Sequence, residues 1–336
     1  MGQTTDVFVV GGGPAGLAAA IAARKRGLDV IVADGVEPPI DKPCGEGLMP
    51  DTLSVLGELG VVINPAEGFA FRGIRFVDGS LEVDGEFPFE QGLGLRRPLL
   101  HQRMIDRAQQ LGVSLLWNTS VSGLSREGVL VGGETIAARW IIGADGIRSR
   151  VRRWCGLETP ELTQPRYAFR RHYHVQPWTD CMEIYWGCDA QAYVTPVGHG
   201  DVCLVLISRN PRLRSASIAT EFPKLAERLA SAGYNSEQGA VTLTCGLQRV
   251  YRDNVALIGD ASGSVDAITG EGLCLSFHQA TALADALACG DLSRYQAAHR
   301  RLARRPTLVG RMLLLLDRQP KIRGRAMQVL AAHPDL

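Results

Sequence analysis

A cluster of glycines follows the first apolar run of the chain. Residues 7–10 read Val-Phe-Val-Val, residues 11–16 read Gly-Gly-Gly-Pro-Ala-Gly, and an alanine-rich segment follows at 17–23. A strand, a glycine-rich turn and a helix in this order are typical of a dinucleotide site, because the turn brings backbone N–H groups to the pyrophosphate at the positive end of the helix. The glycines provide the tight turn, close approach of the phosphates and close packing of helix and strand. The residues that we assign to this turn are Gly11, Gly13, Pro14, Ala15 and Gly16.

A carboxylate stands at the end of the second apolar run. Asp34 follows Val30–Ala33, about 20 residues after the glycines, where an acid accepts hydrogen bonds from a ribose diol. Hydrogen bonds to a charged acceptor contribute about 1.5–3 kcal/mol each. We therefore expect Asp34 to bind the ribose of the dinucleotide.

Two further glycine-containing motifs lie far along the chain. One is GADGIRSRVR at residues 143–152, and the other runs from Gly259-Asp260 to Thr269-Gly270-Glu271-Gly272-Leu273. A dehydrogenase that binds only a nicotinamide cofactor has no need of the last motif. In this order the three motifs resemble those of the FAD-dependent aromatic-ring hydroxylases (p-hydroxybenzoate hydroxylase-like) and geranylgeranyl reductases. The resemblance covers about residues 5–300 and implies noncovalently bound FAD.

The resemblance assigns roles to residues of the later motifs. It implies that Asp260 binds the ribityl hydroxyls of FAD and that residues 270–273 run along the edge of the isoalloxazine ring. An arginine before the helix that leads to the middle motif also contacts FAD in this family; Arg97 matches that position, and Arg96 is an adjacent rival. The cofactor contacts implied in this way are Cys44, Gly45, Arg97, Asp145, Gly259, Asp260, Gly270, Glu271, Gly272 and Leu273.

Three residues are candidates for catalysis. The segment at 42–50 resembles a loop beside the flavin in geranylgeranyl reductases and some halogenases. Within it, Cys44 is a substrate-facing thiol or a passive buried cysteine, and Glu46 is an acid or base or a loop carboxylate in water. Tyr193 is a wall of the pocket, a phenol donor or a plain sheet residue. It replaces a tryptophan of the halogenase signature, as Gln191 does, which disfavours halogenation.

The pattern of apolar segments predicts an α/β fold. We expect a Rossmann-like FAD-binding lobe with three layers and a parallel sheet, formed by residues 1–72, 95–156 and 246–290. The stretches 73–94 and 157–245 are rich in β-pattern and predict an inserted, mostly antiparallel substrate lobe, interrupted by a helix at 217–232. Residues 291–336 are predicted to be a C-terminal helical segment.

One predicted strand of the inserted sheet carries several polar residues. Alternation places Arg170, His172 and His174 on one face of this strand, and Arg171 and Tyr173 on the other. One of the two faces should line the cavity, but the sequence does not distinguish them.

Bulk properties exclude several classes of function. The chain has 336 residues and a net charge of +1, which argues against nucleic acid as a partner. No apolar stretch reaches the ~18–20 residues that span a bilayer, and residues 1–6 do not resemble a signal peptide, so we expect a cytoplasmic protein. The 8 cysteines are scattered without a C-x-x-C pair, and we expect no metal site.

The last 47 residues differ from the rest of the chain in charge. Residues 290–336 carry ten Lys or Arg against three Asp, a net +7, and include the run Met-Leu-Leu-Leu-Leu at 312–316. A basic apolar helix can rest weakly on an anionic membrane surface, although a docked helix with a solvated basic face is commoner. Both interpretations stay open at this point.

The motifs and the resemblance predict one of several flavin-dependent reactions. The first is an NAD(P)H-driven monooxygenase that hydroxylates an apolar, aromatic or polyketide-type small molecule; the alternative is an ene-reductase of the geranylgeranyl reductase type. A halogenase, a flavin-binding protein without turnover and a nicotinamide-only dehydrogenase rank lower. No second G-x-G-x-x-G is present, so NAD(P)H should bind transiently, or a partner should supply the electrons.

Overall fold

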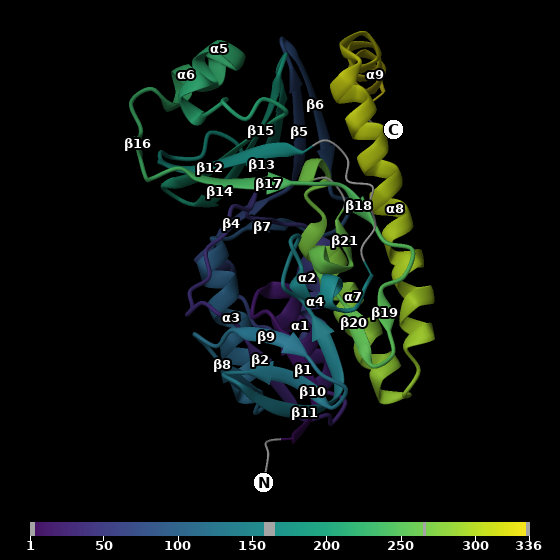
Figure 1. Cartoon of the computed structure of the whole chain (residues 1–336). Helices are drawn as coiled ribbons and strands as arrows, with labels where there is room; N and C mark the ends of the chain where they lie inside the picture. The colour runs from purple at the N-terminus through teal and green to yellow at the C-terminus, as the bar shows by residue number, and fades with distance from the viewer. Residues whose placement is uncertain (1–3, 158–164, 265–266, 334–336) are drawn as a thin grey trace.

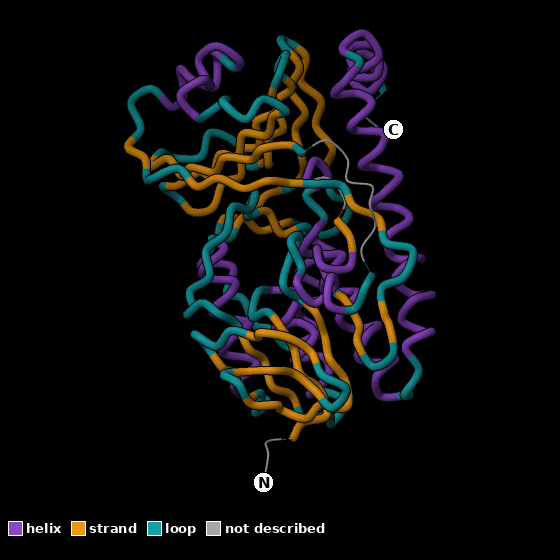
Figure 2. The backbone as a smooth tube through the Cα atoms, viewed as in Figure 1, coloured by secondary structure: helices purple, strands orange, loops and turns teal. Residues whose placement is uncertain are grey.

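The computed structural model describes residues 4–157, 165–264 and 267–333. The chain forms two large sheets stacked one above the other, and a long C-terminal helix runs alongside both, followed by a shorter helix beside the upper sheet (Figures 1 and 2). The predicted α/β fold with a Rossmann-like lobe and an inserted, mostly antiparallel sheet is confirmed.

The first sheet is mainly parallel and has the order β19-β20-β11-β1-β2-β8, with β10 and β9 added beside β11. Its strands are β1 (Thr4–Val10), β2 (Val30–Ala33), β8 (Ser114–Leu116), β9 (Val121–Leu124), β10 (Gly128–Val131), β11 (Glu134–Gly143), β19 (Tyr251–Arg252) and β20 (Val255–Leu257). Because side chains alternate along a strand, Val7 and Val9 of β1 face one way, and Phe8 and Val10 face the other. All four are buried, in separate apolar clusters on the two faces of the sheet.

Helices cover one face of the first sheet. They are α1 (Pro14–Arg24), α2 (Pro50–Leu59), α3 (Arg97–Gln110) and α7 (Gly272–Ala288). The alanines of α1 beyond its first turn are buried on all sides because this helix lies between the sheet, α3 and α7. The opposite face packs on β9, β10 and α4 (Arg150–Trp154), which gives three layers.

The second sheet has the order β16-β12-β15-β14-β13-β5-β6, with β17 paired to β12. All of its pairings are antiparallel except that of β13 with β5. Its strands are β5 (Gly73–Asp78), β6 (Leu81–Glu86), β12 (Arg166–His174), β13 (Cys181–Trp186), β14 (Ala190–Gly198), β15 (Asp201–Ser208), β16 (Gly233–Tyr234) and β17 (Gln238–Thr242). The face away from the first sheet packs on α5 (Ile218–Glu221) and α6 (Pro223–Leu229).

These two short helices replace the single helix predicted over 217–232. The helix is broken at Phe222, whose φ of −140° is not helical. Proline at 223 disfavours helical backbone at the residue before it, and it begins the next helix instead.

A small sheet lies between the two large ones. It joins β3 (Gly47–Leu48) and β4 (Phe69–Phe71) to β7 (Gly92–Gly94). A two-stranded pair, β18 (Cys245–Gly246) with β21 (Gly263–Ser264), links the end of the inserted segment to the third motif.

The C-terminal helix α8 (Leu292–Arg318) is attached to both large sheets, and α9 (Pro320–Ala332) is attached to the second. Near its start, the Tyr295 hydroxyl of α8 donates to the Leu257 carbonyl of β20 at 2.7 Å. Near its end, Asp317 accepts a hydrogen bond of 3.0 Å from Gln191 of β14. Arg323 of α9 forms an ion pair with Asp78 of β5 at 2.8 Å.

Candidate active site

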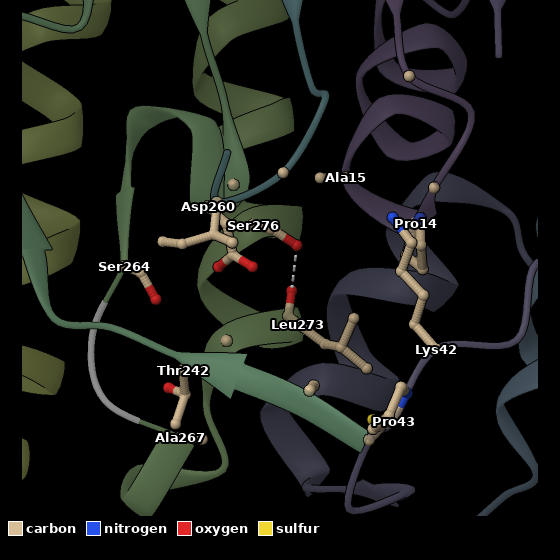
Figure 3. A pocket seen from close by; sticks show the side chains of 18 of the residues that line it. Pro14, Ala15, Lys42, Pro43, Thr242, Asp260, Ser264, Ala267, Leu273 and Ser276 are labelled. Atoms are coloured by element: carbon tan, nitrogen blue, oxygen red, sulfur yellow. Dashed lines mark hydrogen bonds between the residues drawn. The ribbon is translucent and has the colours of Figure 1, made fainter. Parts of the chain in front are cut away.

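A cavity of about 750 Å³ lies between the two large sheets. All three motifs, the loop at 42–47 and the second sheet contribute to its walls. Figure 3 shows the parts from the first and third motifs, the loop and β17. Most residues predicted from the sequence line it, namely Gly11, Gly13, Pro14, Ala15, Asp34, Cys44, Gly45, Glu46, Arg97, Asp145, Tyr193, Gly259, Asp260, Gly270, Gly272 and Leu273. Gly16 and Glu271 are not among the lining residues.

The first glycine turn combines a packed side and an open side. Gly11 has φ +110°, and a Cβ there would lie 2.5 Å from the Ala144 carbonyl oxygen. A Cβ at Gly16 would lie 1.9 Å from the Gly11 oxygen, so Gly16 serves helix packing. At Gly13, by contrast, no atom lies within 4 Å of the Cβ position. The backbone at Gly13 is therefore accessible from the cavity.

The N-terminus of α1 opens onto this accessible stretch. Gly13 is its N-cap, no side chain caps the helix, and its first turn contains no acid. The Lys42 side chain extends toward Pro14 (Figure 3). Arg97 also lines the cavity, and its buried Nε has no hydrogen-bond partner among the described residues. Free N–H groups and two cations fit an anionic pyrophosphate.

Asp34 and a buried histidine hold the turn in shape. The Gly12 N–H donates to Asp34 Oδ2 at 2.7 Å. His101 of α3 accepts the Ile40 N–H at Nδ1 (3.4 Å), and its Nε2 therefore donates to the Gly12 carbonyl at 2.8 Å. Burial lowers the pKa of His101, which agrees with a neutral ring. In the sequence, this role of His101 is indicated only by a polar residue that directly follows the apolar Leu100.

The middle motif forms hydrogen bonds within itself and to the third motif. The Asp145 carboxylate accepts the N–H groups of Arg150 (2.6 Å) and Val151 (3.1 Å) at the start of α4, so its oxygens are used within the protein although the residue lines the cavity. Arg152 donates to the Ile147 carbonyl at 2.8 Å and to the Ala261 carbonyl at 3.2 Å. No pattern in the sequence assigns this role to Arg152.

The third motif presents Asp260 to the cavity. Its carboxylate lies between Ser264 and Ser276 in Figure 3, within the open space. Desolvation by the surrounding protein raises the pKa of Asp260, and the charges of Arg97 and Lys42 offset part of this rise. The charge is thus partly balanced by the two cations expected at the phosphates.

The start of α7 follows the third motif. A Cβ at Gly270 or Gly272 would meet no atom within 4 Å, which leaves open space beside the helix N-terminus. Glu271 is the N-cap residue, but its side chain makes no capping hydrogen bond, and its Oε2 is buried without a hydrogen-bond partner among the described residues. Burial raises the pKa of this carboxyl.

The loop at 42–47 brings two candidate catalytic residues to the cavity. Glu46 is 2% exposed, so the interpretation as a loop carboxylate in water is wrong. Its Oε1 accepts the Arg97 N–H at 3.0 Å and Arg170 Nη1 at 3.2 Å, and its Oε2 lies 2.6 Å from His172 Nε2. Cys44 is half-buried, and its Sγ accepts the Glu46 N–H at 3.4 Å.

These contacts identify the face of β12 that points to the site. Arg170 and His172 reach Glu46, whereas His174 is exposed and binds Asp201 at 2.6 Å. Alternation along the strand predicts that these side chains share one face but does not show which way that face points. Arg171, on the other face, lies over the Tyr234 ring.

Tyr193 connects the second sheet to the third motif. The side chain is 4% exposed and lines the cavity, and its hydroxyl donates to the Ile268 carbonyl at 2.9 Å. Its neighbours in the wall are apolar: Ala168, Met182, Val205 and Ile207.

Glu46, His172 and Cys203 form a cluster with ligand atoms within 4.8 Å of one another. A metal ion there would compete with the direct bond between Glu46 and His172 and with the nearby Arg170 cation. Burial and the Glu46 charge also raise the pKa of the Cys203 thiol well above its usual value, which favours the protonated form over the thiolate that binds metals. The contacts describe a hydrogen-bond network.

Comparison with known proteins identifies the class. A family model described as "FAD binding domain" matches residues 4–170. The glycines without neighbouring atoms, the uncapped α1 and the two cations that line the cavity fit this cofactor. The protein is an FAD-dependent oxidoreductase.

Relatives define the family more closely. The chain is 30% identical over 321 residues to a menaquinone reductase from Mycobacterium tuberculosis, covering 87% of this chain and 78% of the relative. It is 30% identical over 292 residues to digeranylgeranylglycerophospholipid reductase 1 from Methanopyrus kandleri, covering 80% and 76%. The chain belongs to the aromatic-ring hydroxylase and geranylgeranyl reductase superfamily of flavoproteins.

Solved structures share the fold. A geranylgeranyl bacteriochlorophyll reductase-like protein from Thermoplasma acidophilum superposes with a TM-score of 0.78 at 21% identity, covering 93% of this chain and 88% of the other. A p-nitrophenol 4-monooxygenase from Pseudomonas putida gives a TM-score of 0.83 at 18% identity, covering 97% and 93%. Among the described residues, no helix is both long and apolar enough to cross a bilayer.

Proposed function

We propose that the protein is an FAD-dependent reductase that saturates carbon–carbon double bonds of an apolar, isoprenoid-type substrate. The observation that carries this proposal is the apolar wall: among the described lining residues, the second sheet contributes no charged side chain to the cavity. The relatives at 30% identity are named as reductases of menaquinone and of a digeranylgeranyl lipid, which supports the same reaction class.

When bound, FAD supplies the hydride that such a reduction needs. Gly13, Asp34 and Asp260 would hold the nucleotide and ribityl parts, and the α7 N-terminus would face negative charge on the ring. The wall at Ala168, Met182 and Val205 would bind the apolar chain and exclude water.

Saturation of an alkene also requires a proton at the second carbon. Glu46 accepts hydrogen bonds from Arg97, Arg170 and His172, and the Tyr193 proton is donated to the Ile268 carbonyl. The Cys44 thiol, half-buried on the cavity wall, is therefore the proton donor that we favour among the three candidates.

The experiment separates reduction from hydroxylation, which the sequence ranked first. The protein is reduced without oxygen and mixed with a menaquinone or a geranylgeranyl lipid, and flavin reoxidation and product mass are followed. Reoxidation with a product that has gained two hydrogens supports the reductase. A product that gains one oxygen atom, formed only after oxygen is admitted, assigns a monooxygenase instead. Reduction by NADH and NADPH in the same assay tests the expected transient reductant.

We also propose that this protein is cytoplasmic and contacts an anionic membrane surface through α8. Exposed Leu308, Met312 and Leu315 alternate along this helix with exposed arginines, among them Arg304 and Arg311. Such a surface suits anionic lipids because arginine heads reach the lipid phosphates while the apolar side chains enter the interface. Co-sedimentation with phosphatidylserine vesicles, but not with phosphatidylcholine vesicles, is expected, and Arg304→Gln with Arg311→Gln should abolish it.

A further inference from the structure

Arg170 joins the two ends of the loop that runs along the cavity. Its Nη1 and Nη2 lie 2.8 and 2.7 Å from the two Asp41 oxygens, and Nη1 lies 3.2 Å from Oε1 of Glu46. Arg170 is 2% exposed and belongs to the second sheet, whereas both carboxylates belong to the first part of the chain. One buried guanidinium thus closes a loop whose residues 42–47 all line the cavity.

His172 gives the loop a second attachment from the same strand. Asn235 accepts the His172 backbone N–H at its Oδ1 (3.0 Å), so its amide nitrogen faces the His172 ring nitrogen Nδ1 at 3.1 Å. Because an amide nitrogen only donates, Nδ1 is the acceptor and Nε2 carries the ring proton. His172 therefore donates to Glu46 Oε2 at 2.6 Å, and Asn235 fixes this tautomer.

The loop backbone requires such support. Glu46 has φ +60°, in the left-handed region that residues with a side chain rarely adopt. A conformation of this kind persists where the surroundings over-determine it. Here the Glu46 carbonyl also accepts the Leu95 N–H at 2.8 Å, and its carboxylate receives the Arg97 N–H at the start of α3.

We propose that Arg170 and His172 are positioning residues that hold the 42–47 loop in the shape that FAD meets. In this arrangement the Glu46 carboxylate stays paired and does not exchange a proton with the substrate. The inference rests on the proposed function only in that the cavity binds FAD, and it is independent of whether the reaction is reduction or hydroxylation.

The test compares Arg170→Met with Arg171→Met in the full chain. Arg171 is the adjacent residue on the opposite face of β12, where it lies over Tyr234, so its variant controls for loss of an arginine. Hydrogen exchange of the 42–47 amides is measured without FAD, and FAD affinity and the flavin absorption band are measured by titration.

We expect faster loop exchange in Arg170→Met, a shifted flavin band and FAD affinity weakened at least about tenfold, since removal of one partner from a buried ion pair leaves the other charge unpaired. Arg170→Lys should recover part of the affinity, because one ammonium cannot bind both carboxylates as the guanidinium fork does. Arg171→Met should behave as wild type. Unchanged exchange and FAD affinity in a folded Arg170→Met protein would overturn the inference.

Asp41→Asn provides a gentler variant if Arg170→Met does not fold. Asp41 is partly exposed and does not line the cavity, so it can act on FAD only through the loop. We expect a few-fold loss of FAD affinity and faster loop exchange; wild-type values for both contradict the proposal. A Glu46→Gln variant also contradicts the proposal if its FAD affinity is unchanged but the rate of flavin reduction no longer falls on one side of its pH profile. The binding measurements need no substrate, so failure of the alkene assay leaves this inference standing.

Discussion

The two sides of the cavity are built in different ways. Among the described lining residues, every charged side chain comes from the first sheet and the segments around it, while the second sheet contributes mainly apolar groups. The charged side is assembled from short motifs in which a few adjacent residues make the turn, the helix end and the acid. The apolar side is assembled in part by strand pairing over long sequence distances, as between β5 and β13 and between β12 and β17. Changes on the first side should therefore alter cofactor binding, and changes on the second should alter substrate turnover.

The largest effect is expected within the first glycine turn. Gly16→Ala places a Cβ 1.9 Å from a backbone oxygen, whereas Gly13→Ala meets no atom within 4 Å. We expect Gly16→Ala to destabilise the fold by about 3 kcal/mol and to lose FAD. Gly13→Ala should keep the stability of the FAD-free protein and weaken only FAD binding. Thermal unfolding without FAD, followed by FAD titration, compares them; equal stability of the two variants contradicts the packing role of Gly16.

Acid should lower the free energy of unfolding through His299. This residue of α8 is buried against Ser262 of the third motif (2.9 Å), and burial lowers its pKa to about 4. The unfolded chain binds the proton near pH 6.5 and the folded chain only near pH 4, so stability falls as the pH drops through this window, by about 3 kcal/mol in total. Urea unfolding at several pH values measures this loss. In His299→Gln the slope between pH 6.5 and 4 should be smaller; an unchanged slope assigns it to other groups.

The next effect concerns Asp260. Asp260→Ala removes a carboxylate that faces the cavity and should weaken FAD binding by about 10- to 100-fold, or about 1–3 kcal/mol, with the fold intact. The control is Asp285→Ala, an exposed acid on α7 outside the cavity. Fluorescence titration with FAD measures both affinities, and wild-type affinity in Asp260→Ala would remove this residue from the cofactor site.

The smallest effect is expected on the apolar side. Tyr193→Phe removes the hydrogen bond to the Ile268 carbonyl, worth about 1 kcal/mol, and should slow substrate-dependent turnover several-fold with normal FAD content. Tyr185→Phe removes a buried hydroxyl from the opposite face of the same sheet, where it binds Glu183 at 2.8 Å, and should leave turnover unchanged. Loss of FAD in Tyr193→Phe would show that the two sides are not separable.

The sequence predicts the charged side well because its information is local. Gly11, Asp34 and Asp260 are recognisable from their immediate neighbours, and all three line the cavity. The contact between Arg170 and Glu46 spans 124 positions and depends on which face of β12 points inward, which alternation alone leaves undecided. For Asp145, the motif is recognisable in the sequence. That its carboxylate accepts N–H groups at the start of α4 is seen only in the structure.

The length of α8 sets a spacing in this molecule. Its anchors at Tyr295 and Asp317 hold β20 of one sheet and β14 of the other, and the helix continues through Pro306 between them. At 1.5 Å per residue, the anchors are roughly 30 Å apart along the axis. The helix thus sets the distance between the two sheets at these two anchors. Inserting one residue would turn the distal anchor by about 100°, whereas inserting a heptad would nearly preserve its direction and move it by about 10 Å. Homologues with α8 lengths that differ by multiples of seven should therefore differ in cavity height while keeping the same walls.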